Sequence, residues 1–554
     1  MRSLCYSAVT NLLQFLGLAI LAVVSVCESA VGFEIDQHGT SLEVEALKSF
    51  EAGSYADAAG LFRKALAALP EQETAEAAVL WRQLGESEQE QGDLATAEKD
   101  YREAMAVSAK LQTPQYLGTA ACLNDLATVA HARGQFADAE KLLRESYALL
   151  EKNQLAASAI AGAALSNLGM AVEKQGRYEE AGQFYDRALS VIRESTGERS
   201  RELAKVISNS AFLSLETGKY VEAVEKNQRA LAIEKFLQLG ETQEMAFTLN
   251  NLALAKFELG QSSEAEALLI KALAIEKKSP AGPYPSLSEA LNNLAVLERE
   301  EGKLDAARQH EMEALEIIEK HAGKENALAV TILNNLGLVA SGQKDFKEAR
   351  TLYEQAAGIC LRTLGPAHPD YATVLSNIAS LAGRQGHHKK AEELYRRVVE
   401  IDEYRFGAAH PKVATDLGNL AAQLFYEKKY SDADYLFSRV EGIQEKALGT
   451  NNLQVARTWH NLALVKLASK QMEQADDAYA RAIHSLEACS GKQNSGLAPW
   501  LHEYAQLLKK EHRFGEAEQA ETRALGIEVR NTLKAARLEN KDQSTSARKP
   551  ENKS

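Results

Sequence analysis

A repeat of 42 residues is the feature that most constrains the fold of this sequence. Similar segments such as QGDLATAEKDY and RGQFADAEKLL place glycine at this interval, at Gly92, Gly134, Gly176, Gly218, Gly260 and Gly302. The same frame continues at Lys344, Gly386, Lys428, Lys470 and His512, and a shorter step leads back to Gly53. The frame therefore predicts about twelve repeats over residues 39–530, each packed only on its neighbours.

The residues around each frame position predict a pair of helices. An alanine stands five residues after every frame position, which indicates two helices that cross too closely for a larger side chain. These alanines are Ala58, Ala97, Ala139, Ala181, Ala223, Ala265, Ala307, Ala349, Ala391, Ala433, Ala475 and Ala517. A large apolar residue follows four residues later in most copies, as at Phe62, Tyr101 and Tyr185. The spacing is typical of one face of an amphipathic helix, and a second apolar segment precedes each turn. The predicted fold class is all-α.

Proline placement agrees with this unit. Pro285, Pro369 and Pro411 fall at one point of the frame, just before a predicted first helix, where a missing N–H costs nothing. His368 and His410 precede two of these prolines. Their positions favour a role at the start of the helix over a role in catalysis.

The repeat resembles the tetratricopeptide repeat. The resemblance is carried by a small residue at Gly85, Gly169 or Gly337, followed by the alanine and the aromatic residue at the offsets above. The segments LGPAHPDYATVLSNIASLAGRQG and FGAAHPKVATDLGNLAAQLFYEK resemble the repeats of kinesin light chains. The resemblance implies an α-solenoid, a right-handed superhelix of helix–turn–helix repeats whose first helices line a concave face. We do not expect a kinesin light chain itself, since no heptad coiled coil precedes the array.

Asparagine recurs once per repeat in the predicted first helices. We call these eight residues the asparagine ladder: Asn167, Asn209, Asn251, Asn293, Asn335, Asn377, Asn419 and Asn461. In the family, asparagine at this position can point into the groove and hydrogen-bond the backbone of a bound peptide, because its side chain both donates and accepts. The other interpretation is that the ladder bonds to neighbouring repeats and stiffens the stack. The two interpretations are compatible.

The positions beside the ladder predict the chemistry of the groove. Further amides precede it at Asn124, Asn250, Asn292 and Asn334, and apolar residues follow it at Phe212, Leu254, Val296, Leu338 and Leu464. Glu173, Glu216, Glu258 and Glu300 make the middle repeats acidic, which favours a partner segment with lysine or arginine. A solvated charged face is the plainer interpretation of any single glutamate.

These features predict a non-catalytic scaffold that binds a protein or peptide segment in the concave groove. The alternative is a self-assembling structural solenoid of the cell envelope. The net charge of −14 argues against a nucleic-acid partner. The sequence has no phosphate-binding loop, GxSxG or HExxH motif, and its five cysteines lack metal-ligand spacing. We therefore expect no enzyme activity, cofactor or metal site.

The two ends of the chain differ from the repeats. Residues 1–32 resemble a secretory signal, with Arg2 before a charge-free run too short to span a membrane comfortably. We expect an exported protein, periplasmic or secreted; the alternative is membrane anchoring by an uncleaved segment or by lipid on Cys27. The last repeat is degenerate, with Glu503 in the ladder position, which is typical of a cap. Residues 540–554 are almost without apolar residues and are predicted to be disordered.

Overall fold

The structure of the chain is a computed structural model that describes residues 41–51, 54–71, 73–111, 115–237, 242–278 and 286–546. Within these ranges it contains twenty-four α-helices and no β-strand, which confirms the predicted all-α class. The predicted signal segment and Gly53 lie outside the described residues.

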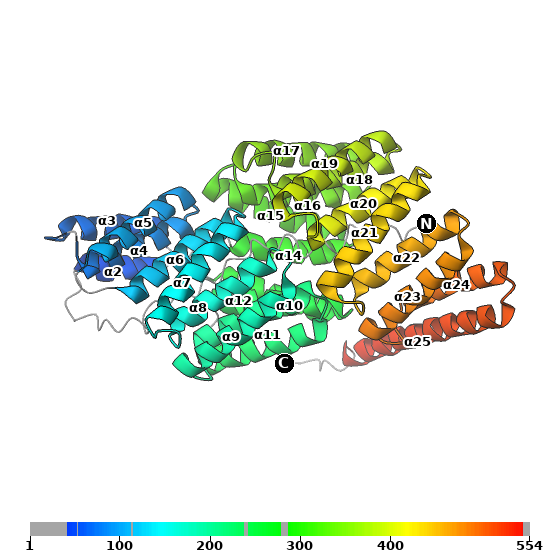
Figure 1. Ribbon diagram of the computed structural model, residues 1–554, viewed down its shortest axis with the longest axis horizontal. Helices are drawn as coiled ribbons and strands as arrows, with labels where there is room; N and C mark the ends of the chain where they lie inside the picture. The colour runs from blue at the N-terminus through cyan, green and yellow to red at the C-terminus, as the bar shows by residue number, and fades with distance from the viewer. Residues whose placement is uncertain are drawn as a thin grey trace, which may run out of the picture. The chain divides into compact units, whose positions relative to one another are not determined.

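The helices follow one another as twelve pairs (Figure 1). The first helices are α2 (Ser41–Glu51), α4 (Ala75–Glu90), α6 (Tyr116–Ala132), α8 (Ala159–Glu173), α10 (Arg201–Glu216), α12 (Gln243–Glu258), α14 (Ser286–Glu300), α16 (Ala327–Gly342), α18 (Pro369–Arg384), α20 (Pro411–Tyr426), α22 (Leu453–Ala468) and α24 (Leu497–Lys510). The second helices are α3 (Tyr55–Ala68), α5 (Leu94–Lys110), α7 (Phe136–Lys152), α9 (Tyr178–Thr196), α11 (Tyr220–Phe236), α13 (Ser262–Glu276), α15 (Leu304–Ala322), α17 (Phe346–Thr363), α19 (His388–Phe406), α21 (Tyr430–Leu448), α23 (Met472–Ser490) and α25 (Phe514–Ser546).

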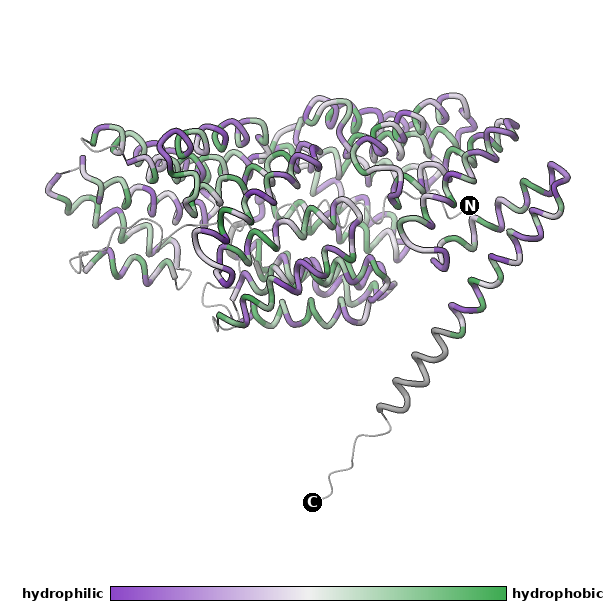
Figure 2. Tube along the Cα trace, turned by 60° about the horizontal axis from the view of Figure 1, so that its bottom comes forward, coloured by the Kyte–Doolittle hydropathy of each residue, from purple (hydrophilic) through white to green (hydrophobic). Residues whose placement is uncertain are grey.

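The pairs belong to two compact units that divide within α18. We call residues 41–377 the N-terminal unit and residues 378–546 the C-terminal unit. Polar and apolar residues alternate along the helices, as amphipathic packing requires (Figure 2). In each unit the apolar faces form buried clusters that extend from one helix pair into the next.

Where the structure describes it, the turn within a pair has a left-handed residue at the frame position predicted from the sequence. Gly92 has a φ of 85° and Gly134 a φ of 67°. Non-glycine residues take the same conformation where the frame lacks glycine, with φ values of 63° at Lys428 and 60° at His512. Since glycine adopts this region at least cost, the sequence favours it at most turns. Each chain reversal therefore has the same geometry.

The two helices of a pair approach closely at small residues. All twelve frame alanines are at most 1% exposed, which confirms the predicted close crossing. In the fourth pair, a Cβ atom placed on Gly169 would lie 2.8 Å from Cε1 of Tyr185, and Gly85 has the same relation to Tyr101. Glycine in the first helix thus makes room for a buried tyrosine ring of the second helix.

This contact predicts that Gly169→Ala destabilises the protein. The new methyl group would overlap a ring that is only 1% exposed, and overpacking of a core costs about 1–3 kcal/mol. The control is Gly442→Ala, because a Cβ atom there meets nothing within 4 Å. Urea unfolding should show a lower midpoint for the first variant and an equal or higher midpoint for the control. Equal midpoints for both variants would contradict the packing argument.

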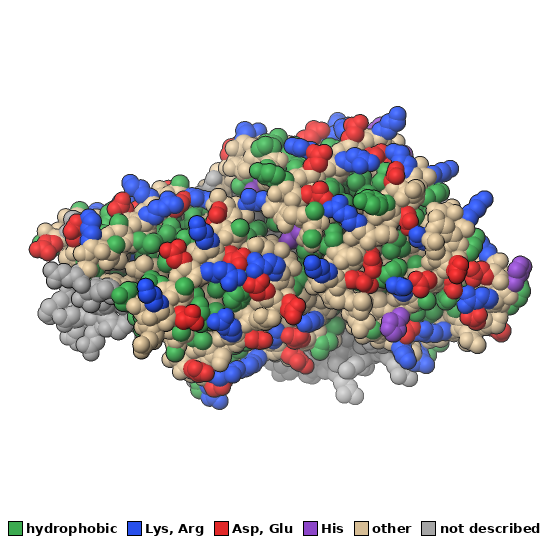
Figure 3. All heavy atoms as spheres, in the orientation of Figure 1, with side chains coloured by type: hydrophobic (Ala, Val, Ile, Leu, Met, Phe, Trp, Pro, Cys, Tyr) green, Lys and Arg blue, Asp and Glu red, His purple; other side chains and the backbone are tan. Residues whose placement is uncertain are grey.

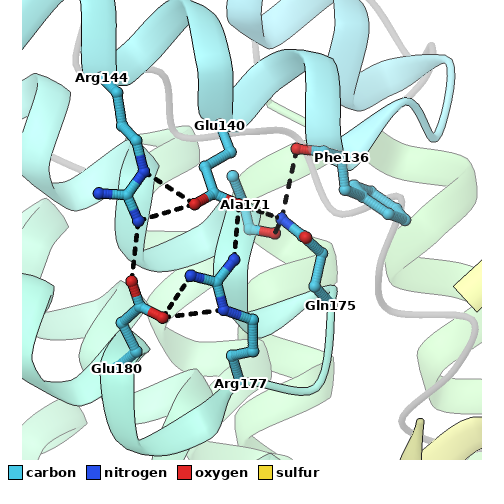
Figure 4. Close-up of polar contacts among 7 residues, drawn as sticks. All are labelled: Phe136, Glu140, Arg144, Ala171, Gln175, Arg177 and Glu180. Atoms are coloured by element: carbon cyan, nitrogen blue, oxygen red, sulfur yellow. Dashed lines mark hydrogen bonds and ion pairs between the residues drawn. The ribbon is translucent and has the colours of Figure 1, made fainter. Parts of the chain in front are cut away.

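Polar contacts also join successive pairs at their turns (Figure 4). The Gln175 side chain donates to the backbone oxygen of Phe136 at 3.5 Å and to Glu140 at 2.8 Å. Arg177 donates to the same Glu140 at 2.7 Å. Equivalent ion pairs recur between later pairs, where Lys303 contacts Glu266 at 2.7 Å and Lys429 contacts Glu392 at 2.6 Å. Side chains just before and just after the turn residue therefore tie several repeats to the repeat before them.

The starts of α18 and α20 and the end of α25 test predictions made from the sequence. Nδ1 of His410 accepts the backbone N–H of Lys412 at 3.0 Å, and His368 accepts that of Asp370 at 3.2 Å, so the predicted role at the helix start is confirmed. The last helix differs from the prediction, because α25 continues to Ser546, into the segment expected to be disordered. Between Gly526 and Pro550 the sequence has no glycine or proline that would end a helix.

Candidate functional site

The asparagine ladder is buried. The exposed fractions of its eight side chains range from 1% at Asn251 to 9% at Asn419. Three of these side chains bond to the preceding repeat. Nδ2 of Asn335 donates to Oδ1 of Asn292 at 2.6 Å, Nδ2 of Asn377 donates to Oδ1 of Asn334 at 2.7 Å, and Nδ2 of Asn209 donates to Oγ of Ser166 at 3.3 Å. These bonds are the stiffening contacts that the second interpretation of the ladder expects.

Other residue types make the same link where asparagine is absent. Nε of Arg82 donates to Oδ2 of Asp125 at 2.5 Å, and Nε2 of His460 lies 2.6 Å from Oε2 of Glu503. Each pair joins a ladder position to the residue before the ladder position of the preceding repeat. The sequence analysis missed these links because it considered only asparagine. Asp125 and Glu503 stand in the ladder positions of their repeats, so the 42-residue spacing is the signal that could have found them. Glu503, read as a sign of degeneracy, has a specific partner.

Some amides of the ladder, and of the positions just before it, have buried polar atoms without a hydrogen-bond partner among the described residues. Both polar atoms of the Asn167 side chain are unpartnered, although the residue is only 4% exposed. Single atoms are unpartnered at Asn124 Oδ1, Asn250 Oδ1, Asn251 Nδ2 and Asn334 Nδ2. A buried polar group without a partner costs about 1–3 kcal/mol. The ladder thus contains satisfied members and members that still need a donor or an acceptor.

The ladder position recurs on one face of the first helices α4 to α16, whether or not asparagine occupies it. The residues four before, three after and seven after a ladder position share that face. We call the ladder positions of α4 to α16, together with these three positions around each, the ladder face. The predicted lining residues belong to it: Phe212 is 9% and Leu254 5% exposed, and Leu338 is half-buried. Phe212, Leu254 and Val296 pack in one apolar cluster. The preceding amides Asn292 and Asn334 are buried and Asn250 is half-buried.

The ladder face is acidic from α4 to α14. Its acidic residues are Glu86, Glu90, Asp125, Glu216, Glu258, Glu289 and Glu300, and its basic residues are Lys174 and Lys205. The surface seen in Figure 3 instead carries acidic and basic side chains interspersed. Glu90, Glu216 and Glu289 form no ion pair or hydrogen bond with the residues that the structure describes. The sequence had singled out Glu216 among these three, whereas Glu90 and Glu289 were missed.

Burial perturbs these carboxyl groups. It raises the pKa of Glu86 to about 7, against the lowering effect of Arg82, and it raises the pKa of Glu289 to about 8 with a contribution from Glu276. Burial also raises the pKa of Glu216, while the charge of Lys174 opposes the change. The ladder face therefore holds carboxyl groups that are short of both water and positive charge.

Contacts between successive first helices, such as α6 with α8 and α10 with α12, place the first helices on the inner side of the N-terminal unit. The charge of Lys205 on α10 lowers the pKa of Glu90 on α4, although burial raises it overall. Likewise, Glu244 on α12 contributes to the raised pKa of Tyr55 on α3. Packing of first helices on one another is expected on the inner side of a curved stack of helix pairs.

The described residues show neither a metal-binding cluster nor a membrane-spanning helix. There, no three or more His, Cys, Asp or Glu side chains are grouped so that they could hold a metal ion. Nor does any described helix combine the length and apolarity needed to cross a membrane. Cys122 and Cys360 are buried and Cys489 is exposed, all as thiols.

The raised pKa of Glu289 predicts a pH-dependent stability. The unfolded carboxyl loses its proton near its usual pKa of 4.5 and the folded carboxyl near 8, so the folded state binds more protons between these values. Stability should therefore fall as pH rises through this window. Glu289→Gln removes the effect and should gain at least about 1 kcal/mol relative to wild type between acidic and mildly alkaline pH. Urea unfolding across this range, with exposed Glu145→Gln as control, measures it; parallel curves for wild type and Glu289→Gln would refute the assignment.

Family comparison identifies the class of protein. The tetratricopeptide repeat profile matches residues 76–152, 161–235, 244–320 and 328–403, and a second tetratricopeptide profile matches residues 456–484. These segments cover more than half of the chain. The chain therefore belongs to the tetratricopeptide repeat family, and its all-α fold is built from the helix pairs of that repeat.

Three solved structures similar to this chain come from three different proteins. BtubC from P. vanneervenii is 23% identical and covers 43% of this chain and 92% of its own, with a TM-score of 0.34. A Rap protein in complex with competence and sporulation factor is 15% identical; the match covers 67% of this chain and 99% of the Rap protein, with a TM-score of 0.48. A third structure contains the TPR-like repeats of a Podosopora anserina kinesin light chain, which are nearly identical to one another. It is 24% identical to this chain, and the match covers 36% of this chain and 93% of that structure, with a TM-score of 0.31. No curated protein matches the chain.

Proposed function

We propose that the chain is a non-catalytic interaction scaffold that binds an extended segment of a partner protein on the ladder face. The observation that carries this proposal is the Asn167 side chain, which is 4% exposed and has no partner for its donor or its acceptor. An extended segment offers a backbone N–H and C=O at each residue, and a carboxamide can bond to both. The bound segment would thus satisfy groups that the protein alone leaves unpaired.

The proposal divides the ladder between two roles. Asn335 and Asn377 are occupied by bonds to the preceding repeat and hold the stack together. Asn167 and Asn251 retain unpartnered atoms and would bond to the segment. Half-buried Met170 and Phe247 lie on the same face and would contact its apolar parts. Each neutral hydrogen bond contributes about 0.5–1.5 kcal/mol, so binding would depend on several repeats.

The test compares two asparagines in different roles. Phage-displayed random dodecapeptides are selected on the full chain, and the affinity of an enriched peptide is measured for Asn167→Ala and Asn335→Ala. Asn167→Ala should weaken binding by about threefold or more, since it loses one hydrogen bond, and should leave the melting temperature unchanged or higher. Asn335→Ala should lower the melting temperature, because Asn292 would lose its bond.

Failure to enrich any peptide would overturn the proposal. An unchanged affinity in Asn167→Ala would also overturn it, because the unpartnered side chain of Asn167 would then have no part in binding. A loss of affinity that only parallels a loss of stability in both variants would assign the whole ladder to the scaffold.

A second candidate function is self-assembly into a structural solenoid of the cell envelope. It is supported by an exposed apolar stripe on α25, where Leu525 is 54%, Val529 58% and Leu533 56% exposed. Residues four apart share a helix face, so these side chains could meet another copy. We also propose export, on the signal-like pattern of residues 1–32, with membrane anchoring as the alternative.

A further inference from the structure

We propose that the segment bound on the ladder face carries lysine or arginine side chains spaced along an extended backbone. This inference rests on the proposed function and adds the chemical class of its partner. Three features of the N-terminal unit support it: an excess of carboxyl groups on the ladder face, the lack of partners for some of them, and the amides and apolar side chains between them.

The excess of acid is confined to one face of six consecutive first helices. From α4 to α14 the ladder face carries seven acidic and two basic residues. Both basic residues are already engaged within the chain. Lys174 lies over the Phe212 ring at 4.7 Å, and Lys205 lies 3.5 Å from Glu244. Positive charge from outside the chain would therefore be favoured on this face.

Three carboxyl groups have no internal cation to contact. Glu90 is exposed and Glu216 and Glu289 are half-buried, and none of the three forms an ion pair or hydrogen bond with the described residues. They come from α4, α10 and α14, so they are spread along the face rather than gathered at one point. A divalent ion would need several carboxyl groups around one position, whereas spaced cationic side chains suit this distribution.

The amides provide evidence that is independent of charge. Asn167 and Asn251, each at most 4% exposed, lie on the same helix faces and carry unpartnered atoms that match a peptide backbone. Half-buried Met170 and Phe247 lie next to them along the face. Lysine and arginine place long aliphatic stems on apolar surface while their charged ends reach polar groups. Backbone, stem and charged end of the segment would each find complementary groups on the ladder face.

The test uses three synthetic dodecapeptides that alternate serine with lysine, glutamine or glutamate. Fluorescence anisotropy on the full chain near neutral pH should show the lysine peptide binding about tenfold more tightly than the glutamine peptide, and the glutamate peptide not binding. The preference should shrink as salt is added, because ions screen exposed charges.

Two triple variants, each replacing three glutamates with glutamine, locate the binding. Glu90→Gln, Glu216→Gln and Glu289→Gln together should weaken the lysine peptide by about tenfold. This variant should melt no lower than wild type, since none of the three carboxyl groups has an ion pair or hydrogen bond within the described residues to lose. The control combines Glu103→Gln, Glu145→Gln and Glu225→Gln, which are exposed on second helices, and should retain the wild-type affinity.

The outcomes separate this inference from the function on which it rests. Equal loss of affinity in both triple variants would mean attraction to net charge alone and would overturn the inference. Equal binding of the lysine and glutamine peptides would also overturn it, while peptides selected through Asn167 would leave the proposed function standing. If no selected or synthetic peptide binds, the proposed function itself fails.

Discussion

The close approach of the two helices within each pair is the constraint on which the rest of the structure depends. Frame alanines at most 1% exposed, and glycines such as Gly169 beneath a tyrosine ring, allow the two helices of a pair to approach closely. Because every frame position that the structure describes is left-handed, whether it is glycine, lysine or histidine, consecutive pairs can stack in one register. That register brings each ladder position beside the residue that precedes the ladder in the repeat before it.

Much of this fold could be predicted from the sequence, because residues that recur at a fixed spacing occupy the same packing position in every repeat. The frame identified the turns, including Lys428 and His512, whose left-handed backbone has no glycine to signal it. It also identified the alanines and the helix starts at His368 and His410. The extension of α25 to Ser546 was missed because polar composition was taken as disorder, although nothing in that segment ends a helix.

The site could be predicted only in part, because a side chain's partners depend on how pairs stack. The ladder was visible as a pattern, yet the pattern could not separate Asn335, bonded to Asn292, from Asn167, which has no partner. Nor could it show that Asp125 replaces asparagine and bonds to Arg82. Acidity was visible at Glu216, but the pattern could not show that the charge of Lys205 on α10 acts on the pKa of Glu90 on α4. One periodic surface thus combines structural links with groups that remain available to a partner.

The central claim is that repeats are equivalent units whose register, rather than their number, determines folding. Deletion of one full repeat, residues 251–292, tests it most directly, with deletion of half that length, residues 251–271, as the comparison. Circular dichroism should show that the first deletion keeps wild-type helicity per residue and a cooperative thermal transition, because every remaining pair regains an equivalent neighbour. The shorter deletion breaks the register and should lose both. Equal loss of helicity in the two deletions would contradict the account.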